Sequence, residues 1–293
     1  MMEPLERAST LPCWSTTVTP VPLSGGLSNH NFVVEDNGQK YVCRVGADQP
    51  IHNVLRFNEQ SVGRAAEAVG VTPRQIYTEP DVLVIEFIDG KTLGPKDVSI
   101  ELDRILPRIK HFHEAGMRAL RGPILGFSVF HIHRHYAKLL HDANSRMKPE
   151  LGRLVEISEE LETAVGPVRV ALGHNDLLAA NFIDDGDKIW IIDWEHAGFS
   201  TPLFDLANIA SNSVLSDDLE AHMLETYYGV VPDANLWCRY RAFRAASHLR
   251  EAMWSMIAEI YSQIDVDYVA YTGKNLSDFE ISYDFFKSVA EKR

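Results

Sequence analysis

Three polar side chains near the middle of the chain have the types and the spacing that phosphoryl transfer needs. Asp176 and Asn181 share the segment 174–181, and Asp193 follows the apolar run 189–192. Phosphoryl transfer requires the attacking hydroxyl, the phosphate and Mg²⁺ in line, and little covalent help from the protein. One carboxylate can orient the hydroxyl, while an amide oxygen and a second carboxylate bind the metal. We therefore predict that all three residues are catalytic, and that Asn181 and Asp193 are the metal ligands.

Two further residues flank this set. His174 begins the segment, and we expect it to hold the backbone of the loop rather than to carry a proton. Asp205 lies near the start of a helix that the sequence predicts over 203–212. Two interpretations of Asp205 stay open: a helix N-cap, or a buried carboxylate that ties down the catalytic loop.

The elements that must position these residues change in character along the chain. The first third favours strands, with Asp36-Asn37-Gly38 as the signal for a hairpin turn. Later segments have the apolar spacing of helices. The predicted strands are 32–35, 41–45 and 82–88, together with a strand pair around the loop of Asp176 and Asn181, the second strand ending at Asp193. The predicted helices are 53–69, one from 97 onward, 130–164 with a break near Pro149, 203–212, 216–228 and 234–261.

This order predicts an α+β protein with a two-lobed, protein-kinase-like fold. We expect residues 1–88 to form a small β-rich N-lobe that binds the nucleotide. Residues 89–293 would form a larger, mainly α-helical C-lobe that carries catalysis and substrate binding. The hinge is expected around 86–90, where Glu86 and Ile88 would contact the nucleotide.

The N-lobe also contains candidates for phosphate binding. The turn 25–29 includes Gly26, Ser28 and Asn29, and its small residues could bring backbone N–H groups onto the ATP phosphates. Arg44 ends the second hairpin strand, where kinases keep a phosphate-binding lysine, and Glu59 on the following helix is placed to pair with it.

Composition limits the classes of partner. The net charge of −13 argues against nucleic acid and anionic membranes. The three cysteines are far apart in the sequence, which suits a reducing compartment. The N-terminal residues have no secretory signal pattern, and no apolar run is long enough to span a membrane. We therefore expect a cytoplasmic protein with no membrane insertion, and we leave its oligomeric state open, with a dimer as one option.

A histidine-rich stretch includes His131, His133 and His135. On a helix only the first and last of these share a face, and no carboxylate or cysteine nearby completes a metal site. We expect these histidines to lie on a polar helix face.

Motifs along nearly the whole chain resemble those of the choline/ethanolamine kinase family, relatives of the aminoglycoside phosphotransferases, and the match looks closer to bacterial members. The resemblance implies ATP-dependent, Mg²⁺-dependent phosphorylation of a small amino-alcohol. The matching segments are 25–29, 41–45, 174–176, 192–195, 204–208, 246–248, 253–257 and 264–268.

The resemblance also implies a substrate site. Such a site holds its ammonium group with aromatic faces and carboxylates, and Trp254 and Tyr268 match aromatic positions of the family. Glu251 stands where a second tryptophan is expected, and a carboxylate suits an ammonium with N–H donors better than a methylated one. We expect Asp176 and Glu195 to lie at the same site.

The sequence therefore predicts an ATP-dependent kinase that phosphorylates the hydroxyl of a choline- or ethanolamine-type amino-alcohol. Two alternatives stay open. The first is a kinase of the same superfamily for an aminoglycoside or another metabolite. The second is a nucleotide-binding protein without transfer activity, against which the presence of Asp176, Asn181 and Asp193 argues.

Overall fold

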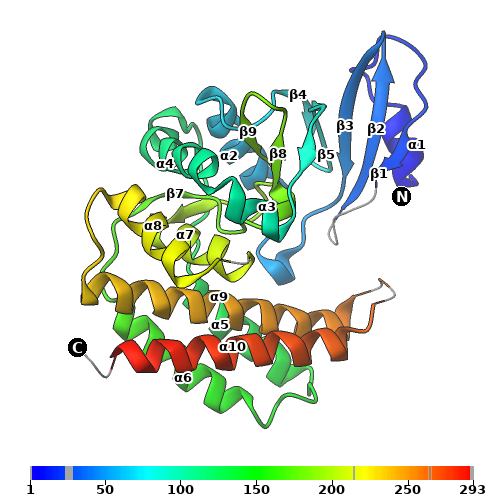
Figure 1. Ribbon diagram of the computed structural model, residues 1–293. Helices are drawn as coiled ribbons and strands as arrows, with labels where there is room; N and C mark the ends of the chain where they lie inside the picture. The colour runs from blue at the N-terminus through cyan, green and yellow to red at the C-terminus, as the bar shows by residue number, and fades with distance from the viewer. Residues whose placement is uncertain (1, 24–28, 214, 263, 265, 291–293) are drawn as a thin grey trace.

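The computed structural model describes residues 2–23, 29–213, 215–262, 264 and 266–290, and it has two lobes (Figure 1). The smaller N-lobe is built on an antiparallel sheet with the strand order β1-β2-β3-β5-β4. The predicted β-rich N-lobe is confirmed, although the sequence did not predict β1 and β4. The strands are β1 (Val21–Leu23), β2 (His30–Asp36), β3 (Gln39–Val45), β4 (Gln75–Glu79) and β5 (Val82–Glu86).

The β2–β3 hairpin forms at the predicted turn. Asp36 pairs with Gln39, so that only two residues connect the strands. Those residues, Asn37 and Gly38, have φ angles of 51° and 75°, the left-handed conformation of a turn whose twist matches that of the strands. The buried side chains of the hairpin pack with helix α1 (Pro4–Ser9), which the sequence analysis did not predict.

Helix α2 (Arg56–Ala68) follows the hairpin after a 3₁₀ turn, η1 (Pro50–His52). It packs against β4 on one side and against α4 of the C-lobe on the other. Its buried residues Val62, Ala65 and Ala66 belong to the same apolar core as the C-lobe helices. Helix α2 therefore packs against both lobes, and it brings Glu59 next to Arg44 of β3.

The C-lobe is mainly helical, as predicted (Figure 1). The predicted break near Pro149 is confirmed: the helical segment 130–164 forms two helices, which are separated by residues 143–150. The last helix of the chain was not predicted. The helices are α3 (Pro95–Ile100), α4 (Leu102–Ala119), α5 (Val129–Asp142), α6 (Leu151–Val165), α7 (Pro202–Ser211), α8 (Asp217–Tyr228), α9 (Ala234–Tyr261) and α10 (Tyr268–Ala290).

Short strands between α6 and α7 carry the catalytic segment. β7 (Ala171–Gly173) pairs with β10 (Gly198–Ser200), and β8 (Phe182–Asp184) pairs with both β6 (Lys91–Thr92) and β9 (Ile189–Ile191). The 3₁₀ turn η2 (Ala179–Asn181) leads into β8. The pairing of β6 with β8 places residue 91 already within the C-lobe. The division of the chain at residue 88 itself stays a prediction.

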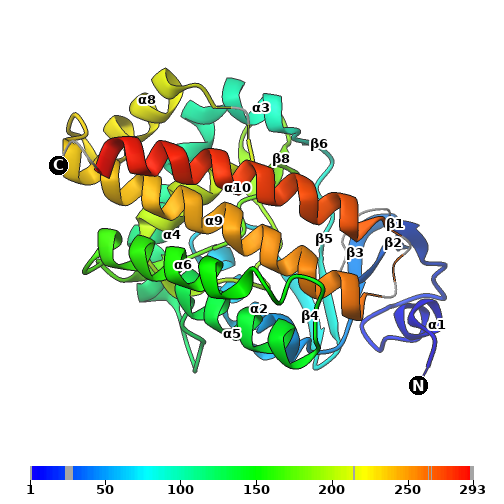
Figure 2. The same ribbon diagram turned by 90° about the horizontal axis from the view of Figure 1, so that it is seen from below.

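Helices α9 and α10 run side by side along the C-lobe, and α5 and α6 pack on α9 (Figures 1 and 2). Helix α7 packs on α9 as well, so that α9 lies between the catalytic strands and the outer helices. In the parts of the chain that the structure describes, no helix is long and apolar enough to cross a membrane.

Candidate active site

The two acidic residues of the predicted catalytic set lie at the ends of short strands. Strand β7 leads through His174 and Asn175 to Asp176, and strand β9 leads to Asp193. Asn175 and Asp193 have φ angles of 66° and 68°. Non-glycine residues hold this left-handed conformation only where the surrounding structure enforces it, and such residues cluster at functional sites.

Asp205 enforces the conformation of the catalytic loop. Its carboxylate is fully buried and accepts the backbone N–H groups of His174 (2.8 Å) and Asn175 (2.7 Å). It also accepts a hydrogen bond from Nε2 of His113 (2.8 Å). Burial acts to raise the pKa of Asp205, but these hydrogen bonds and the nearby histidines outweigh burial and lower it. Thr201 is the N-cap residue of α7, so the buried-carboxylate interpretation of Asp205 is the one that the structure supports.

His174 holds the loop backbone, as predicted. Its Nε2 lies 2.9 Å from the carbonyl oxygen of Ile192, and its Nδ1 lies 3.3 Å from the backbone nitrogen of Asp176. Because a carbonyl only accepts, Nε2 carries the proton and Nδ1 accepts the N–H of Asp176. The imidazole therefore ties the Asp176 loop to the strand that ends at Asp193.

The two predicted metal ligands are brought together by a backbone hydrogen bond between their segments. The backbone N–H of Ile192 donates to the carbonyl of Asn181 (2.9 Å), which sets Asn181 beside the start of the Asp193 turn. The Asn181 amide nitrogen donates to the carbonyl of Asp176 (2.8 Å), so its side-chain oxygen is the atom left for a cation. An amide oxygen and a carboxylate are a donor set that fits Mg²⁺, which keeps several waters and phosphate oxygens as ligands.

Arg44 of the N-lobe reaches across to Asp193. Its Nη1 donates to Asp193 Oδ1 (2.9 Å) and also forms an ion pair with Glu59, as predicted. Burial acts to raise the pKa of Asp193, but Arg44 outweighs burial and keeps that pKa below its ordinary value. Asp193 is therefore held as an ionised carboxylate beside Arg44.

A second arginine, Arg56, extends this network, and the sequence analysis missed it. Its Nη1 donates to Glu59 (2.6 Å) and to Glu195 (3.2 Å). The Asn29 amide also donates to Glu195 (3.2 Å). Burial and the nearby Asp193 raise the pKa of Glu195 to about 7. The side chain of Asn29 is thus turned toward the catalytic strands.

The other predicted nucleotide contacts are placed only in part. Gly26 and Ser28 lie outside the described residues. Glu86 ends β5, and Ile88 follows it in the connection to β6; both are partly exposed. This is the strand end at which we expect the hinge, and a nucleotide contact at either residue stays a prediction.

The predicted substrate residues of the C-lobe meet at α9 and α10. Tyr271 donates its hydroxyl to Glu251 (2.8 Å). The ring of Trp254 lies edge-on to Tyr271 and to Tyr268, with centroids 6.5 and 6.2 Å apart. His52 of the N-lobe covers Trp254 from the other side, with the ring centroids 5.8 Å apart. We call Glu251, Trp254, Tyr268 and Tyr271 the acceptor wall.

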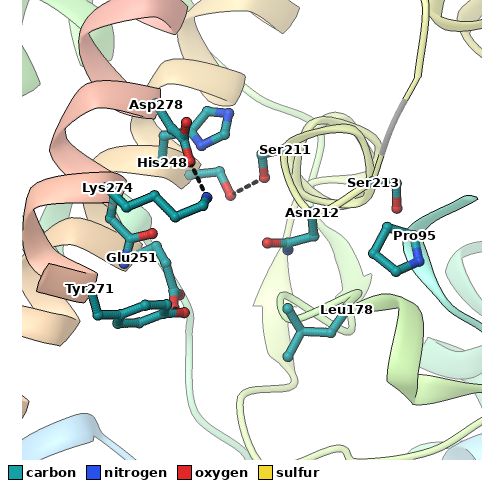
Figure 3. Close-up of a pocket in the computed structure, with 12 residues that line it drawn as sticks. Pro95, Leu178, Ser211, Asn212, Ser213, His248, Glu251, Tyr271, Lys274 and Asp278 are labelled. Atoms are coloured by element: carbon teal, nitrogen blue, oxygen red, sulfur yellow. Dashed lines mark hydrogen bonds and ion pairs between the residues drawn. The ribbon is translucent and has the colours of Figure 1, made fainter. Parts of the chain in front are cut away.

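Glu251 opens onto a polar cavity of about 290 Å³ (Figure 3). Residues of α9 and α10 form one side, and Leu178 of the catalytic segment faces them together with residues of α3 and the end of α7. Burial raises the pKa of Glu251. The lining residues are Pro95, Leu178, Ser211, Asn212, Ser213, Ser247, His248, Glu251, Tyr271, Lys274, Asn275 and Asp278.

Comparison with known proteins agrees with this geometry. Residues 19–243 match the phosphotransferase enzyme family, and this segment is most of the chain. The chain belongs to the phosphotransferase enzyme family.

Curated relatives and a solved structure are similar to this chain. Protein LicA of Haemophilus influenzae is 27% identical over 71% of this chain, and the match spans 62% of that protein. Ethanolamine kinase 2 of Mus musculus is 26% identical over 82% of this chain and 69% of its own length. A choline/ethanolamine kinase family protein from Mesorhizobium loti has the same protein-kinase-like fold, with a TM-score of 0.79, 21% identity, and coverage of 98% of this chain and 97% of that one.

Two sequence-based expectations for this phosphotransferase need comment. Of the predicted substrate residues, Glu251 lines the cavity of about 290 Å³, whereas Asp176, Trp254 and Tyr268 do not. Glu195 lines a second cavity of about 220 Å³ beside His52 and Asn58. Its predicted contact with the substrate stays a prediction. The expectation that His133 lies on a polar helix face is wrong. His133 is fully buried and bonds Ser158 and the carbonyl of Ala246, because α5 packs between α6 and α9.

The histidine-rich stretch can be compared with the possible metal-binding groups of the structure. Across the parts of the chain that the structure describes, no group of three His, Cys, Asp or Glu side chains could hold a metal ion. His131, unlike His133, is exposed.

The sequence analysis of the phosphotransferase also missed Arg250, Tyr271 and His52. Arg250 directly precedes Glu251 in the mainly buried helix α9, so that a pair of adjacent charges between apolar residues was an available signal. Tyr271 and His52 had no such signal. Tyr271 belongs to the helix that was not predicted, and His52 reaches the acceptor wall only through the packing of the two lobes.

Proposed function

We propose that the protein transfers the γ-phosphoryl group of ATP to the hydroxyl of a small amino-alcohol. The observation that carries this proposal is the state of Glu251. Its side chain is partly buried at a polar cavity, and Tyr271 donates to its carboxylate. Burial raises the pKa of Glu251 even though the charge of the adjacent Arg250 opposes that rise. Within the described part of the chain, no cationic side chain forms an ion pair with Glu251. A buried carboxylate without a paired cation is costly, and an ammonium group of the substrate supplies the missing charge.

The reacting hydroxyl would be oriented by Asp176. Its side chain is 18% exposed, so an acceptor can reach it. In a loose transition state positioning matters more than proton abstraction, and an ionised carboxylate beside the hydroxyl is sufficient. Asp176 would receive the hydroxyl proton as the acceptor oxygen bonds to the γ-phosphorus and the bond from that phosphorus to the bridging oxygen breaks, releasing ADP.

The nucleotide phosphates would lie beside Arg44 and the metal ligands. Arg44 of the N-lobe bonds Asp193, so its guanidinium lies next to one of the two proposed metal ligands. Glu59 and Arg56 fix it there through buried ion pairs. Asn181 and Asp193 would hold Mg²⁺, which neutralises phosphate charge and aligns the transferred group when bound.

The acceptor ammonium would sit between Glu251 and the Trp254 ring. Attraction of a cation to the aromatic face contributes about 0.5–2 kcal/mol. Glu251 adds a charge-assisted hydrogen bond only if the ammonium retains an N–H. A primary or secondary amine therefore fits this wall at least as well as the trimethylated group of choline.

One observation favours a second candidate, a larger polyhydroxylated amine such as an aminoglycoside. The cavity is about 290 Å³, whereas a four-heavy-atom amino-alcohol needs room comparable to about four waters at ~30 Å³ each. Asn212, His248 and Lys274 add polar groups beyond Glu251. These groups could bond further hydroxyls of a larger acceptor.

An ATP-coupled assay with a graded series of acceptors separates these possibilities. The series is ethanolamine, its mono- and dimethyl derivatives, choline and an aminoglycoside, each with and without Mg²⁺. We expect kcat/KM for ethanolamine or the monomethyl derivative to equal or exceed that for choline, and no turnover without a divalent cation. Exclusive use of choline would contradict the role of Glu251, and exclusive use of the aminoglycoside would favour the second candidate. No transfer to any acceptor would refute the proposed function.

A further inference from the structure

Arg250 is a buried cation in direct contact with the catalytic loop. Its Nη1 donates to Oδ1 of Asp176 (3.0 Å) and to the carbonyl of Asn175 (3.1 Å). The side chain is 6% exposed, and its guanidinium lies over the ring of Phe127, 5.6 Å from the centroid. A charge buried this deeply is retained only where it is paired.

The contacts of Asp176 leave one oxygen for the acceptor. Its backbone carbonyl accepts from the Asn181 amide (2.8 Å) and from the N–H of Leu178 (2.9 Å). Its carboxylate oxygen Oδ1 accepts from Arg250. Among the residues that the structure describes, none donates to Oδ2. Arg250 therefore fixes the rotation of the carboxylate and presents Oδ2 to the partly exposed side.

Arg250 and Asp205 hold the loop with opposite charges, one through its oxygens and the other through its backbone N–H groups. The Asp205 carboxylate accepts the backbone N–H groups of His174 and Asn175. The Arg250 guanidinium donates to oxygens of Asn175 and Asp176. Asn175, which both contact, has the left-handed φ of 66°. The carboxylate fixes where the loop begins, and the guanidinium fixes where its functional oxygen points.

We propose that Arg250 is a positioning residue that acts through Asp176, holding its carboxylate in the orientation that receives the acceptor hydroxyl. This inference rests on the proposed function, since it assigns that role to Asp176. It differs from a direct contact between Arg250 and the transferred phosphate, because such a contact would act on ATP whether or not Asp176 is present. It also differs from a purely structural ion pair, which would affect stability but not turnover of the folded protein.

The test compares Arg250→Met and Arg250→Lys with the wild-type protein under steady-state conditions. Methionine keeps much of the volume without the charge, and we expect kcat to fall about 10²-fold, the effect of a small misplacement of a reacting group. KM for MgATP should stay unchanged. Lysine keeps the charge but not the planar pair of donors, so we expect its kcat to lie between those of Arg250→Met and the wild type.

Arg241→Met is the matched control. Arg241 lies on the same helix, is similarly buried, and pairs with Glu220 instead of the catalytic loop. This variant loses a buried ion pair and should unfold more easily, while the folded protein keeps its kcat. If Arg250→Met does not fold, Arg250→Lys carries the same test through its lower kcat and unchanged KM for MgATP.

Combination with Asp176→Asn separates action through Asp176 from independent action. Residues that act as one unit have non-additive effects on kcat. We expect the double variant, with Arg250→Met or with Arg250→Lys, to be about as slow as Asp176→Asn alone. A further loss as large as that of the Arg250 variant by itself would overturn the inference.

A raised KM for MgATP, or an undiminished kcat in the folded Arg250 variants, would also overturn it. Either result would leave the proposed function intact, because the wild type would still phosphorylate its acceptor. Absence of transfer by the wild type would overturn both.

Discussion

The carboxylates around the catalytic loop and the carboxylate of the acceptor wall are paired differently. Around the loop, Asp176 bonds Arg250, Asp193 bonds Arg44, and the fully buried Asp205 of α7 bonds His113 and two backbone N–H groups. In the wall, Glu251 bonds the neutral hydroxyl of Tyr271. The pKa values of Asp193 and Asp205 are lowered, and the pKa of Glu251 is raised.

This difference separates two tasks. A carboxylate whose charge is already matched within the protein is fixed in place and ready to orient a substrate group or a metal. A carboxylate that is desolvated and unmatched favours the arrival of a cation, because the cation removes the cost of its burial. The loop is therefore preorganised before ligands bind, whereas the wall is completed electrostatically only by an ammonium group.

The largest effect is expected from Asp176→Asn. The change removes the negative charge that orients the hydroxyl but keeps the shape of the side chain, so kcat should fall by about 10²–10⁴-fold. MgATP binding should change little, whereas the unfolding temperature should fall, because the buried Arg250 loses its charged partner. Asp187→Asn, in the exposed turn before β9, is the control. Near-normal turnover of Asp176→Asn would mean that the loop is not the catalytic region.

A smaller and more selective effect is expected at the wall. Glu251→Gln should raise KM for ethanolamine about tenfold, because a hydrogen bond to a charged group contributes about 1.5–3 kcal/mol. KM for MgATP should not change. Glu259→Gln is the control, since Glu259 lies on the same helix and pairs with Arg146.

Glu251→Trp is the complementary change. It replaces the carboxylate with an aromatic face, which holds a methylated ammonium well. The ratio of kcat/KM for ethanolamine to that for choline should therefore fall. An unchanged ratio would show that the wall does not read the ammonium group.

The sequence predicted the loop better than the wall. Asp176, Asn181 and Asp193 lie within one strand–turn–strand segment, where spacing alone places them together. The partners of these residues could not be predicted in the same way. Arg250 comes from a helix more than seventy residues later, and Arg44 and Arg56 come from the other lobe.

The wall depends on packing that local patterns do not determine. Glu251 and Trp254 were predicted from the resemblance to a family. The contact of Tyr271 with Glu251 requires that α10 fold back along α9, and α10 has polar residues interspersed along its length. The burial of His133 likewise follows from three helices meeting, since the histidine by itself has no apolar signature.

The buried histidine under α9 predicts that acid weakens the support of this helix, which carries both Arg250 and Glu251, before it protonates Asp205. His133 lies beneath α9, with its Nε2 3.0 Å from the carbonyl of Ala246, one turn before Arg250, and its Nδ1 2.8 Å from Ser158. Burial lowers the pKa of His133 to about 3. The hydrogen bond to Ala246 acts to raise this pKa, and the charges of Arg250 and Arg134 act to lower it further. The loop instead depends on Asp205, whose pKa is lowered from an already acidic value.

The sign follows from proton binding. Between pH ~6.5 and the folded pKa, the unfolded chain binds a proton at residue 133 that the folded protein does not. The free energy of unfolding therefore decreases as the pH is lowered, by up to ~1.4 kcal/mol per pH unit. Asp205 begins to contribute only near pH ~3.9 and below. The test measures the free energy of unfolding in urea between pH 7 and 4.5. Its slope against pH should be smaller for His133→Gln than for the wild type, by an amount that corresponds to at most one bound proton. His131→Gln, at the exposed position of the same helix, should keep the wild-type slope. Equal slopes in all three proteins would show that a neutral His133 is not what supports α9 beneath the acceptor wall.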